Sequence, residues 1–323
     1  MKISIAMATY NGAKYLQEQL DSFAVQTLLP DELVVCDDGS TDQTLEIIEN
    51  FSRTAAFSVR IYRNETRLGY AQNFGRAMSL CTGDVTFLSD QDDYWFINKI
   101  ETVTAIFNSD KNIWLIINDA QMTNDSLNPT GQTILGQMKL AKSNNNIYCH
   151  GCCSAYRKII SPALLPIPAE MVGHDVWLHQ LGISLNIRKE ITKCLQYYRR
   201  HDKNISPNTI ARKKPVSLLI HVFSSKNLLP NPVDACKSRI LELFSFRQRL
   251  IDKKDFLSIN LPDSSTLKNT ITKIEKLIPA NKIRRDILLK RFPSRFYSAT
   301  YYYLTGGYKN FEGIKSFAKD VLR

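Results

Sequence analysis

The first hundred residues alternate between short apolar runs and segments with helical spacing. Apolar runs at 3–9, 33–36, 59–62 and 85–88 are each followed by apolar residues on one helical face. This alternation predicts a mainly parallel α/β sheet with crossover helices. The four strands are expected to end at Thr9, Asp38, Asn64 and Asp90, where ligands bind in sheets of this kind.

Beyond residue 107 the chain is predicted to continue as two different regions. Runs at 114–120, 147–156 and 187–198 indicate further strands, 175–185 a helix, and the Asn/Ser/Thr-rich stretch 123–146 a long loop. Basic amphipathic helices are expected after residue 204, at 216–223, 240–251, 271–278 and 283–292, followed by the aromatic stretch 296–303. We therefore expect one α/β domain over 1–204 and a helical region over 205–323.

Charge divides at the same place. Residues 1–204 hold 19 Lys/Arg and 22 Asp/Glu, a net charge of −3, whereas residues 205–323 hold 23 and 9, a net charge of +14. A basic region can bind nucleic acid or an anionic membrane, pack on the first domain, or form an oligomer contact. Without a zinc finger or RNA-binding signature, nucleic acid is disfavoured. Basic helices with clustered Tyr and Phe favour the membrane surface, and packing stays open as the alternative.

The compartment follows from the cysteines and the first residues. Seven cysteines are an odd number spread along the chain, which favours reduced thiols over a disulfide framework. The apolar stretch near the N-terminus is shorter than a signal-peptide core, and no run reaches the roughly 18 residues of a membrane span. A cytoplasmic protein is expected. In YCHGCC (148–153) a zinc site is the minor alternative to half-buried strand residues.

Two acidic motifs follow the second and fourth apolar runs. Asp90-Gln91-Asp92 would place two carboxylates on the same side of an extended segment, where a cation such as Mg²⁺ or Mn²⁺ relieves their repulsion. Because Mg²⁺ fills its other positions with water and phosphates, the motif suggests a nucleoside diphosphate site. Surface aspartates or helix caps are the alternative. Asp38 could accept a hydrogen bond from a uracil or thymine N3–H, and Tyr10 offers a ring that can lie against the base.

Four ordered motifs resemble glycosyltransferase family 2: ATYNG (8–12), VVCDDGSTDQT (34–44), N-x-x-x-A-x-x-x-C-x-G-D (73–84) and LSDQDDYW (88–95). The resemblance implies a GT-A fold and an inverting enzyme that uses a nucleotide sugar. GHDVWL (173–178) and YYRRHDKN (197–204) are similar to segments of its rhamnosyltransferase-like branch, which builds bacterial surface polysaccharides such as O-antigen; Val176 stands where that branch has an aromatic residue.

The resemblance also implies roles for individual residues. Asp175, at the start of a predicted helix, would be the general base, with His174 as its rival. Asp92 would bind Mg²⁺ or Mn²⁺ together with His201, and Asp93 and His174 would lie in a second shell or near the acceptor. The nucleotide sugar would be held by Thr9, Tyr10, Asn11, Asp38, Asn73, Asp90 and Gln91.

The donor and the acceptor follow less directly. The branch resemblance favours dTDP-rhamnose and a lipid-linked saccharide acceptor, while UDP-hexoses and UDP-N-acetylhexosamines stay open. A nucleotide-sugar-binding module without catalysis is the rival from another class, but it would need no base at Asp175. A nucleotidyltransferase would want a Gly-rich phosphate loop after the first strand, and a dehydrogenase a G-x-G-x-x-G; ATYNGAKYL offers neither.

Overall fold

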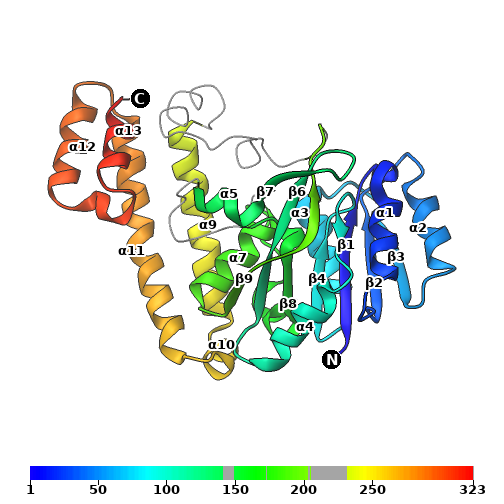
Figure 1. The fold of residues 1–323 in the computed structure, drawn as a ribbon. Helices are drawn as coiled ribbons and strands as arrows, with labels where there is room; N and C mark the ends of the chain where they lie inside the picture. The colour runs from blue at the N-terminus through cyan, green and yellow to red at the C-terminus, as the bar shows by residue number, and fades with distance from the viewer. Residues whose placement is uncertain (141–148, 172, 203, 205–230, 323) are drawn as a thin grey trace. The chain divides into compact units, whose positions relative to one another are not determined.

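The computed structural model describes residues 1–140, 149–171, 173–202, 204 and 231–322 (Figure 1). The chain divides into two compact units, residues 1–216 and 217–323. No described helix combines the length and the apolar content needed to cross a membrane.

The first unit is built on a nine-stranded sheet in the order β3-β2-β1-β4-β8-β6-β9-β5, with β7 paired to β6. Neighbours among the first four strands are parallel, and β8 joins them antiparallel to β4. Beyond β8 the sheet is mixed, because β9 runs parallel to β6 and β5 antiparallel to β9. The strands are β1 (Ile3–Thr9), β2 (Glu32–Asp37), β3 (Ser58–Arg63), β4 (Val85–Ser89), β5 (Tyr94–Trp95), β6 (Leu115–Thr123), β7 (Pro129–Thr133), β8 (Ser154–Arg157) and β9 (Arg188–Arg199).

The central strands are buried on both faces, as their near-continuous apolar sequences require. In β1, the odd-numbered Ile3, Ile5 and Met7 join one core cluster, and the even-numbered residues point to the opposite face. Helices α1, α2 and α4 supply Leu16, Ile48 and other side chains to that cluster, whereas α3 contacts β1 and β2. The sheet therefore lies between helical layers. The helices of this unit are α1 (Ala13–Ala24), α2 (Thr44–Ser52), α3 (Tyr70–Leu80), α4 (Lys99–Ser109), α5 (Ile134–Leu140), α6 (Ser161–Leu164) and α7 (His174–Ser184).

Two predicted elements differ from the structure. The predicted loop 123–146 contains β7 and α5, because its apolar side chains Ile134, Leu135 and Met138 pack into a small second core. The strand predicted over 147–156 is confined to β8, since Gly151–Cys153 form a 3-10 turn instead. Residues 141–148 lie outside the described part of the chain.

The second unit is helical where it is described. It contains α9 (Pro232–Asp252), α10 (Lys254–Asn260), α11 (Ser264–Leu289), α12 (Ser294–Leu304) and α13 (Ile314–Leu322). The two helices predicted at 271–278 and 283–292 are one helix, α11, which continues through Pro279. The helix predicted at 216–223 lies outside the described residues.

The buried Glu32 carboxylate links β1, β3 and the segment before β4 by hydrogen bonds. The Glu32 side chain accepts hydrogen bonds from Ser4 Oγ (2.5 Å), Thr82 N (2.6 Å) and an Arg60 guanidinium nitrogen (2.7 Å). Burial by itself would raise the pKa of Glu32, but these hydrogen bonds and the Arg60 charge lower it from 4.5 to about 2. The ionised form is therefore stabilised by folding.

The Glu32→Gln variant is expected to lose about 3 kcal/mol of unfolding free energy at pH 7, from the depressed pKa. Because the folded pKa is the lower one, this stabilisation is present above about pH 4.5 and fades as the pH falls toward about 2. Urea titrations of both proteins from pH 7 downward measure it, with Glu49→Gln, an exposed carboxylate, as control. Equal stabilities of wild type and variant at pH 7 would contradict the role of Glu32.

Candidate functional site

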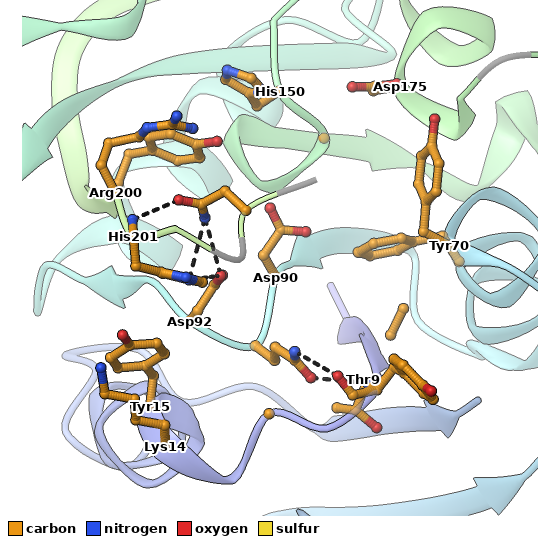
Figure 2. A pocket seen from close by; sticks show the side chains of 18 of the residues that line it. Thr9, Lys14, Tyr15, Tyr70, Asp90, Asp92, His150, Asp175, Arg200 and His201 are labelled. Atoms are coloured by element: carbon orange, nitrogen blue, oxygen red, sulfur yellow. Dashed lines mark hydrogen bonds and ion pairs between the residues drawn. The ribbon is translucent and has the colours of Figure 1, made fainter. Parts of the chain in front are cut away.

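A large cavity of about 1260 Å³ opens at the carboxyl ends of the parallel strands (Figure 2). The segments after β1, β2 and β4 line it, together with the start of α7 and the segment after β9. Parallel strands bring their carboxyl ends to one edge of the sheet, so residues 9, 38 and 90 converge although they are far apart in the sequence. The predicted residues that line it are Thr9, Tyr10, Asn11, Asp38, Asn73, Asp90, Gln91, Asp92, His174, Asp175 and His201.

Asp38 organises the segment between β3 and α3. Its carboxylate accepts hydrogen bonds from Asn64 Nδ2 (2.7 Å), Leu68 N (2.7 Å) and Gly69 N (2.9 Å). Arg67 Nε also lies 3.9 Å from Asp38 Oδ2, so this buried carboxylate is held by charge as well as by hydrogen bonds. Both ends of the Asn73 amide have protein partners. Its Nδ2 donates to Cys36 O (2.8 Å), and its Oδ1 accepts from Asn64 Nδ2.

Other predicted nucleotide residues also hold the backbone. Thr9 Oγ1 donates to Asp37 (2.9 Å), and Asn11 Oδ1 accepts from Thr41 N (2.8 Å). Both side chains therefore fix the shape of the loop after β1.

Gln91 joins the segment after β4 to the segment after β1. Its Oε1 accepts from Tyr10 N (3.0 Å) and its Nε2 donates to Tyr10 O (3.1 Å), so one side-chain amide pairs with one backbone residue in both directions. Glycine at position 12 makes this possible, since a Cβ there would lie 2.2 Å from Gln91 Oε1. The Tyr10 ring is 38% exposed, and the Arg67 guanidinium covers it 3.9 Å from its centre. Arg67 therefore already occupies one face of the ring that was predicted to lie against a base.

The sequence predicted an extended segment at Asp90–Asp93. In the structure this segment bends at residues 91 and 92. This bend separates the two carboxylates of the D-x-D motif. Asp90 lies with Asp93 and Cys152 in a group whose ligand atoms are within 4.8 Å of one another, whereas Asp92 pairs with His201.

Asp92 contacts two residues that follow strand β9. Its Oδ2 lies 2.7 Å from His201 Nε2 and accepts a hydrogen bond from Asn204 Nδ2 (3.3 Å). The His201 ring packs on Tyr15 with 4.7 Å between ring centres. The contact between Asp92 and His201 therefore brings the two predicted metal ligands together.

The electrostatics of this cluster favour a cation. Burial, together with the negative charge of Asp92, raises the pKa of Asp90 to about 7. Burial and the negative charges of Asp92 and Asp90 also raise the pKa of Asp93. A divalent cation would restore the ionised forms, and carboxylate oxygens with one imidazole suit Mg²⁺ or Mn²⁺. The described residues therefore offer two places for a cation, the pair of Asp92 with His201 and the group of Asp90, Asp93 and Cys152.

Asp93 joins this segment to strand β9 by hydrogen bonds. It is fully buried and accepts hydrogen bonds from Gln196 Nε2 (3.0 Å) and Arg199 N (3.2 Å). Gln196 in turn contacts the buried Lys99, whose ammonium also donates to Cys152 O (3.0 Å). Burial lowers the pKa of Lys99 to about 8. Asp93 is not among the residues that line the cavity, and its role in a second shell or near the acceptor stays a prediction.

Asp175 lies in the first turn of α7, at the edge of the cavity (Figure 2). Its Oδ1 accepts a hydrogen bond from the following amide, Val176 N (2.8 Å). The N-cap position is Gly173, so Asp175 is not the cap of the helix. The Tyr70 hydroxyl lies on the same side, 3.3 Å from where a Cβ on Gly173 would stand, and burial and the Asp175 charge raise the pKa of Tyr70.

His174 is buried in the cavity wall. Its ring stacks on Phe74 (3.9 Å between centres), and neither ring nitrogen has a hydrogen-bond partner among the residues that the structure describes. Burial lowers the pKa of His174, so the ring is neutral at pH 7. A Cβ at Gly151 would lie 2.2 Å from His174 Nε2, which explains the glycine there.

Several residues of the cavity were not predicted as site residues. Arg200 and Asn204 lie in the YYRRHDKN segment, so the sequence carried a signal for them. His150 lies in YCHGCC, but its ring stacks on Tyr198 (4.7 Å), and Cys152 is grouped with aspartates instead of with His150. No such signal marked Lys14, Tyr15, Arg67, Tyr70 and Phe74.

The family comparison agrees with this arrangement. Residues 4–164, which include β1 to β4 and the Asp90–Asp93 segment, match the model of glycosyl transferase family 2. The chain carries a glycosyl transferase family 2 domain. It is 27% identical over 185 residues to the putative glycosyltransferase EpsE of Bacillus subtilis (strain 168), covering 55% of this chain and 66% of EpsE. It is 36% identical over 109 residues to the dTDP-rhamnosyl transferase RfbG of Shigella flexneri, covering 32% of this chain and 38% of RfbG.

Solved structures share the fold at lower identity. S. aureus TarS 1-349 in complex with UDP superposes with a TM-score of 0.53 at 18% identity, over 95% of this chain and 80% of that chain. The mannosyltransferase PcManGT from Pyrobaculum calidifontis, in complex with GDP-Man and Mn²⁺, gives a TM-score of 0.50 at 14% identity, over 99% and 86%. The predicted GT-A-like α/β fold with a helical C-terminal region is confirmed.

Proposed function

We propose that this protein is an inverting glycosyltransferase that moves a sugar from a nucleotide-sugar donor to a saccharide hydroxyl. One observation carries the proposal: the cavity of the family 2 domain is lined by Asp38 and Tyr10, by Asp90 and Asp92, and by Asp175. These residues are suited to hold a base, a metal-bound diphosphate and an acceptor hydroxyl. A module that only bound nucleotide sugars would have no use for Asp175.

Asp92 and His201 would hold Mg²⁺ or Mn²⁺ on the diphosphate, with Asp90 facing the ribose or the sugar. The metal would act as a Lewis acid on the leaving diphosphate. The protein's own part is to orient the phosphates and to keep Asp92 in place, which Arg199 does by donating to Asp92 O (2.8 Å). PcManGT, which has this fold, was solved with Mn²⁺.

Asp175 would be the general base. As the acceptor oxygen attacks the anomeric carbon, the bond to the diphosphate oxygen breaks, and the acceptor proton passes to the Asp175 carboxylate. One displacement inverts the configuration. The first turn of α7 stabilises the carboxylate through its amides, and Val176 N fixes one of its oxygens.

The donor that we favour is dTDP-rhamnose, and the acceptor a lipid-linked glycan of an O-antigen or capsule, assembled at the cytoplasmic face of the membrane. The segments GHDVWL and YYRRHDKN and the similarity to RfbG support this choice. UDP-hexoses and UDP-N-acetylhexosamines are the alternative, supported by the fold shared with TarS, which was solved with UDP-GlcNAc. Asp38 could accept the N3–H of either thymine or uracil.

A donor screen tests the proposal. The purified full chain is incubated with dTDP-, UDP- and GDP-sugars, with Mn²⁺, Mg²⁺ or EDTA, and donor binding is followed by calorimetry and slow hydrolysis by nucleotide release. We expect metal-dependent binding of dTDP-rhamnose or of one UDP-sugar. Binding of no donor in either metal would contradict the proposed function.

A further inference from the structure

The helix α12 has its aromatic face turned outward. Tyr297, Tyr301 and Leu304 follow one another at i, i+4 and i+7, so they form one stripe along the helix. Their side chains are 69%, 73% and 77% exposed, and Phe292, just before the helix, is 79% exposed. A surface helix ordinarily turns polar residues to water and buries its apolar stripe.

The opposite face of α12 already has its packing. Ala299 is fully buried, Tyr302 packs edge-on against Tyr308 (5.2 Å between ring centres), and Tyr303 packs against Phe317 (5.0 Å). The residues of the exposed stripe therefore do not belong to the core of the second unit. It is a second apolar face on a helix that is already anchored.

The charged residues in the segment that carries this stripe, between Asp286 and Glu312, are all positive. From 287 to 311 the chain has four charged residues, Lys290, Arg291, Arg295 and Lys309, and no Asp or Glu. Lys290 donates to Ser298 Oγ (2.8 Å) and Arg295 to the backbone oxygens of Lys290 and Leu288. None of the four forms an ion pair with a carboxylate of the described residues, so their charge stays available.

We propose that this surface, defined as Phe292, Tyr297, Tyr301 and Leu304 with Arg291 and Lys309 at its rim, docks the protein on an anionic lipid bilayer. Tyrosine rings have an apolar body and a polar hydroxyl, which suits the boundary between headgroups and acyl chains. The basic rim complements the anionic headgroups. An eleven-residue helix is about 16 Å long, half the roughly 30 Å of a bilayer core, so α12 lies along the surface.

The charges argue against a second copy of the chain as the occupant. A two-fold contact places the same patch on both subunits, so the four cations would face four cations. An anionic surface removes this repulsion, and a like-charged copy increases it. Docking does not depend on the proposed transfer reaction, because neither donor nor acceptor takes part in it.

Vesicle flotation of the full chain tests the apolar part of this surface. The vesicles are phosphatidylcholine with or without phosphatidylglycerol. The double variant Tyr297→Ser with Tyr301→Ser is expected to bind anionic vesicles about tenfold more weakly. Its matched control, Leu241→Ser with Ile259→Ser, removes two side chains that are 58% and 81% exposed on α9 and α10, and should bind as the wild type does.

Charge variants test the rim separately. Arg291→Gln with Lys309→Gln should weaken binding about 30-fold on anionic vesicles. The control Lys254→Gln with Lys268→Gln removes the same charge, and Lys268 lies at the start of α11, about 30 Å along that helix from its end. Its effect should stay below about threefold, because charges beyond a Debye length are screened.

A fluorescent probe locates the contact. The three native tryptophans, Trp95, Trp114 and Trp177, are buried, so a Tyr301→Trp variant adds the emission of an exposed ring. A blue shift of this emission on adding anionic vesicles is expected. Wild-type vesicle binding by both double variants, or an unshifted emission, would overturn the proposal. So would a lipid-independent dimer that Tyr297→Ser with Tyr301→Ser abolishes, measured by sedimentation velocity.

Discussion

Asp175→Asn is expected to lower kcat about 10³-fold, while the Kd of the nucleotide sugar changes less than about threefold. The amide has nearly the shape of the carboxylate and can still accept from Val176 N, but it cannot take the acceptor proton. Single-turnover transfer measures the chemical step, and calorimetry of donor binding measures the rest of the site.

The control for this variant is Asp202→Asn, a change at an exposed aspartate on the rim of the same cavity. It removes the same charge and should retain kcat within about twofold. If Asp175→Asn kept most of its rate, the base would be another group. His174, buried and neutral with both ring nitrogens free of hydrogen bonds in the described structure, would then be the first to test.

Asp92→Ala is expected to weaken metal-dependent donor binding at least about 100-fold and to abolish the difference between Mn²⁺ and EDTA. The variant loses the carboxylate that pairs with His201, so the diphosphate loses its cation. Calorimetric titration of the donor with each metal and with EDTA measures this loss, and thermal melting checks the fold.

An exposed aspartate on α1, replaced as Asp21→Ala, serves as the control and should bind donor as the wild type does. Unchanged metal-dependent binding by Asp92→Ala would exclude Asp92 as a metal ligand. The Asp90–Asp93–Cys152 group would then be the remaining place for a cation among the described residues.

The strands and the place of the site could be predicted from the sequence. Apolar runs and their polar ends locate β1, β2, β3 and β4 to within a residue or two, because local hydrophobic periodicity and turn residues determine them. The convergence of Thr9, Asp38 and Asp90 then follows from the parallel arrangement alone.

The side-chain partners could not be predicted in this way. Arg67 on Tyr10, Gln91 on the Tyr10 backbone and Gln196 beneath Asp93 join residues that are 57 or more positions apart. No local pattern contains such pairs. The bend at residues 91 and 92, which divides the D-x-D carboxylates between Asp93 and His201, follows from these distant partners and not from the tripeptide itself.

The pairing of Asp92 with His201 has a consequence for how the chain acquires its site during synthesis. The two residues are 109 positions apart, and Arg199, which holds the Asp92 and Asp93 backbone segment, comes almost as late. At about 5 to 20 residues per second, a ribosome needs about 5 to 20 s to translate that interval. Through that time Asp92 and Asp93 lack the partners that His201, Gln196 and Arg199 supply, so a nascent chain that stops before β9 would display a sheet with an unfinished, acidic edge.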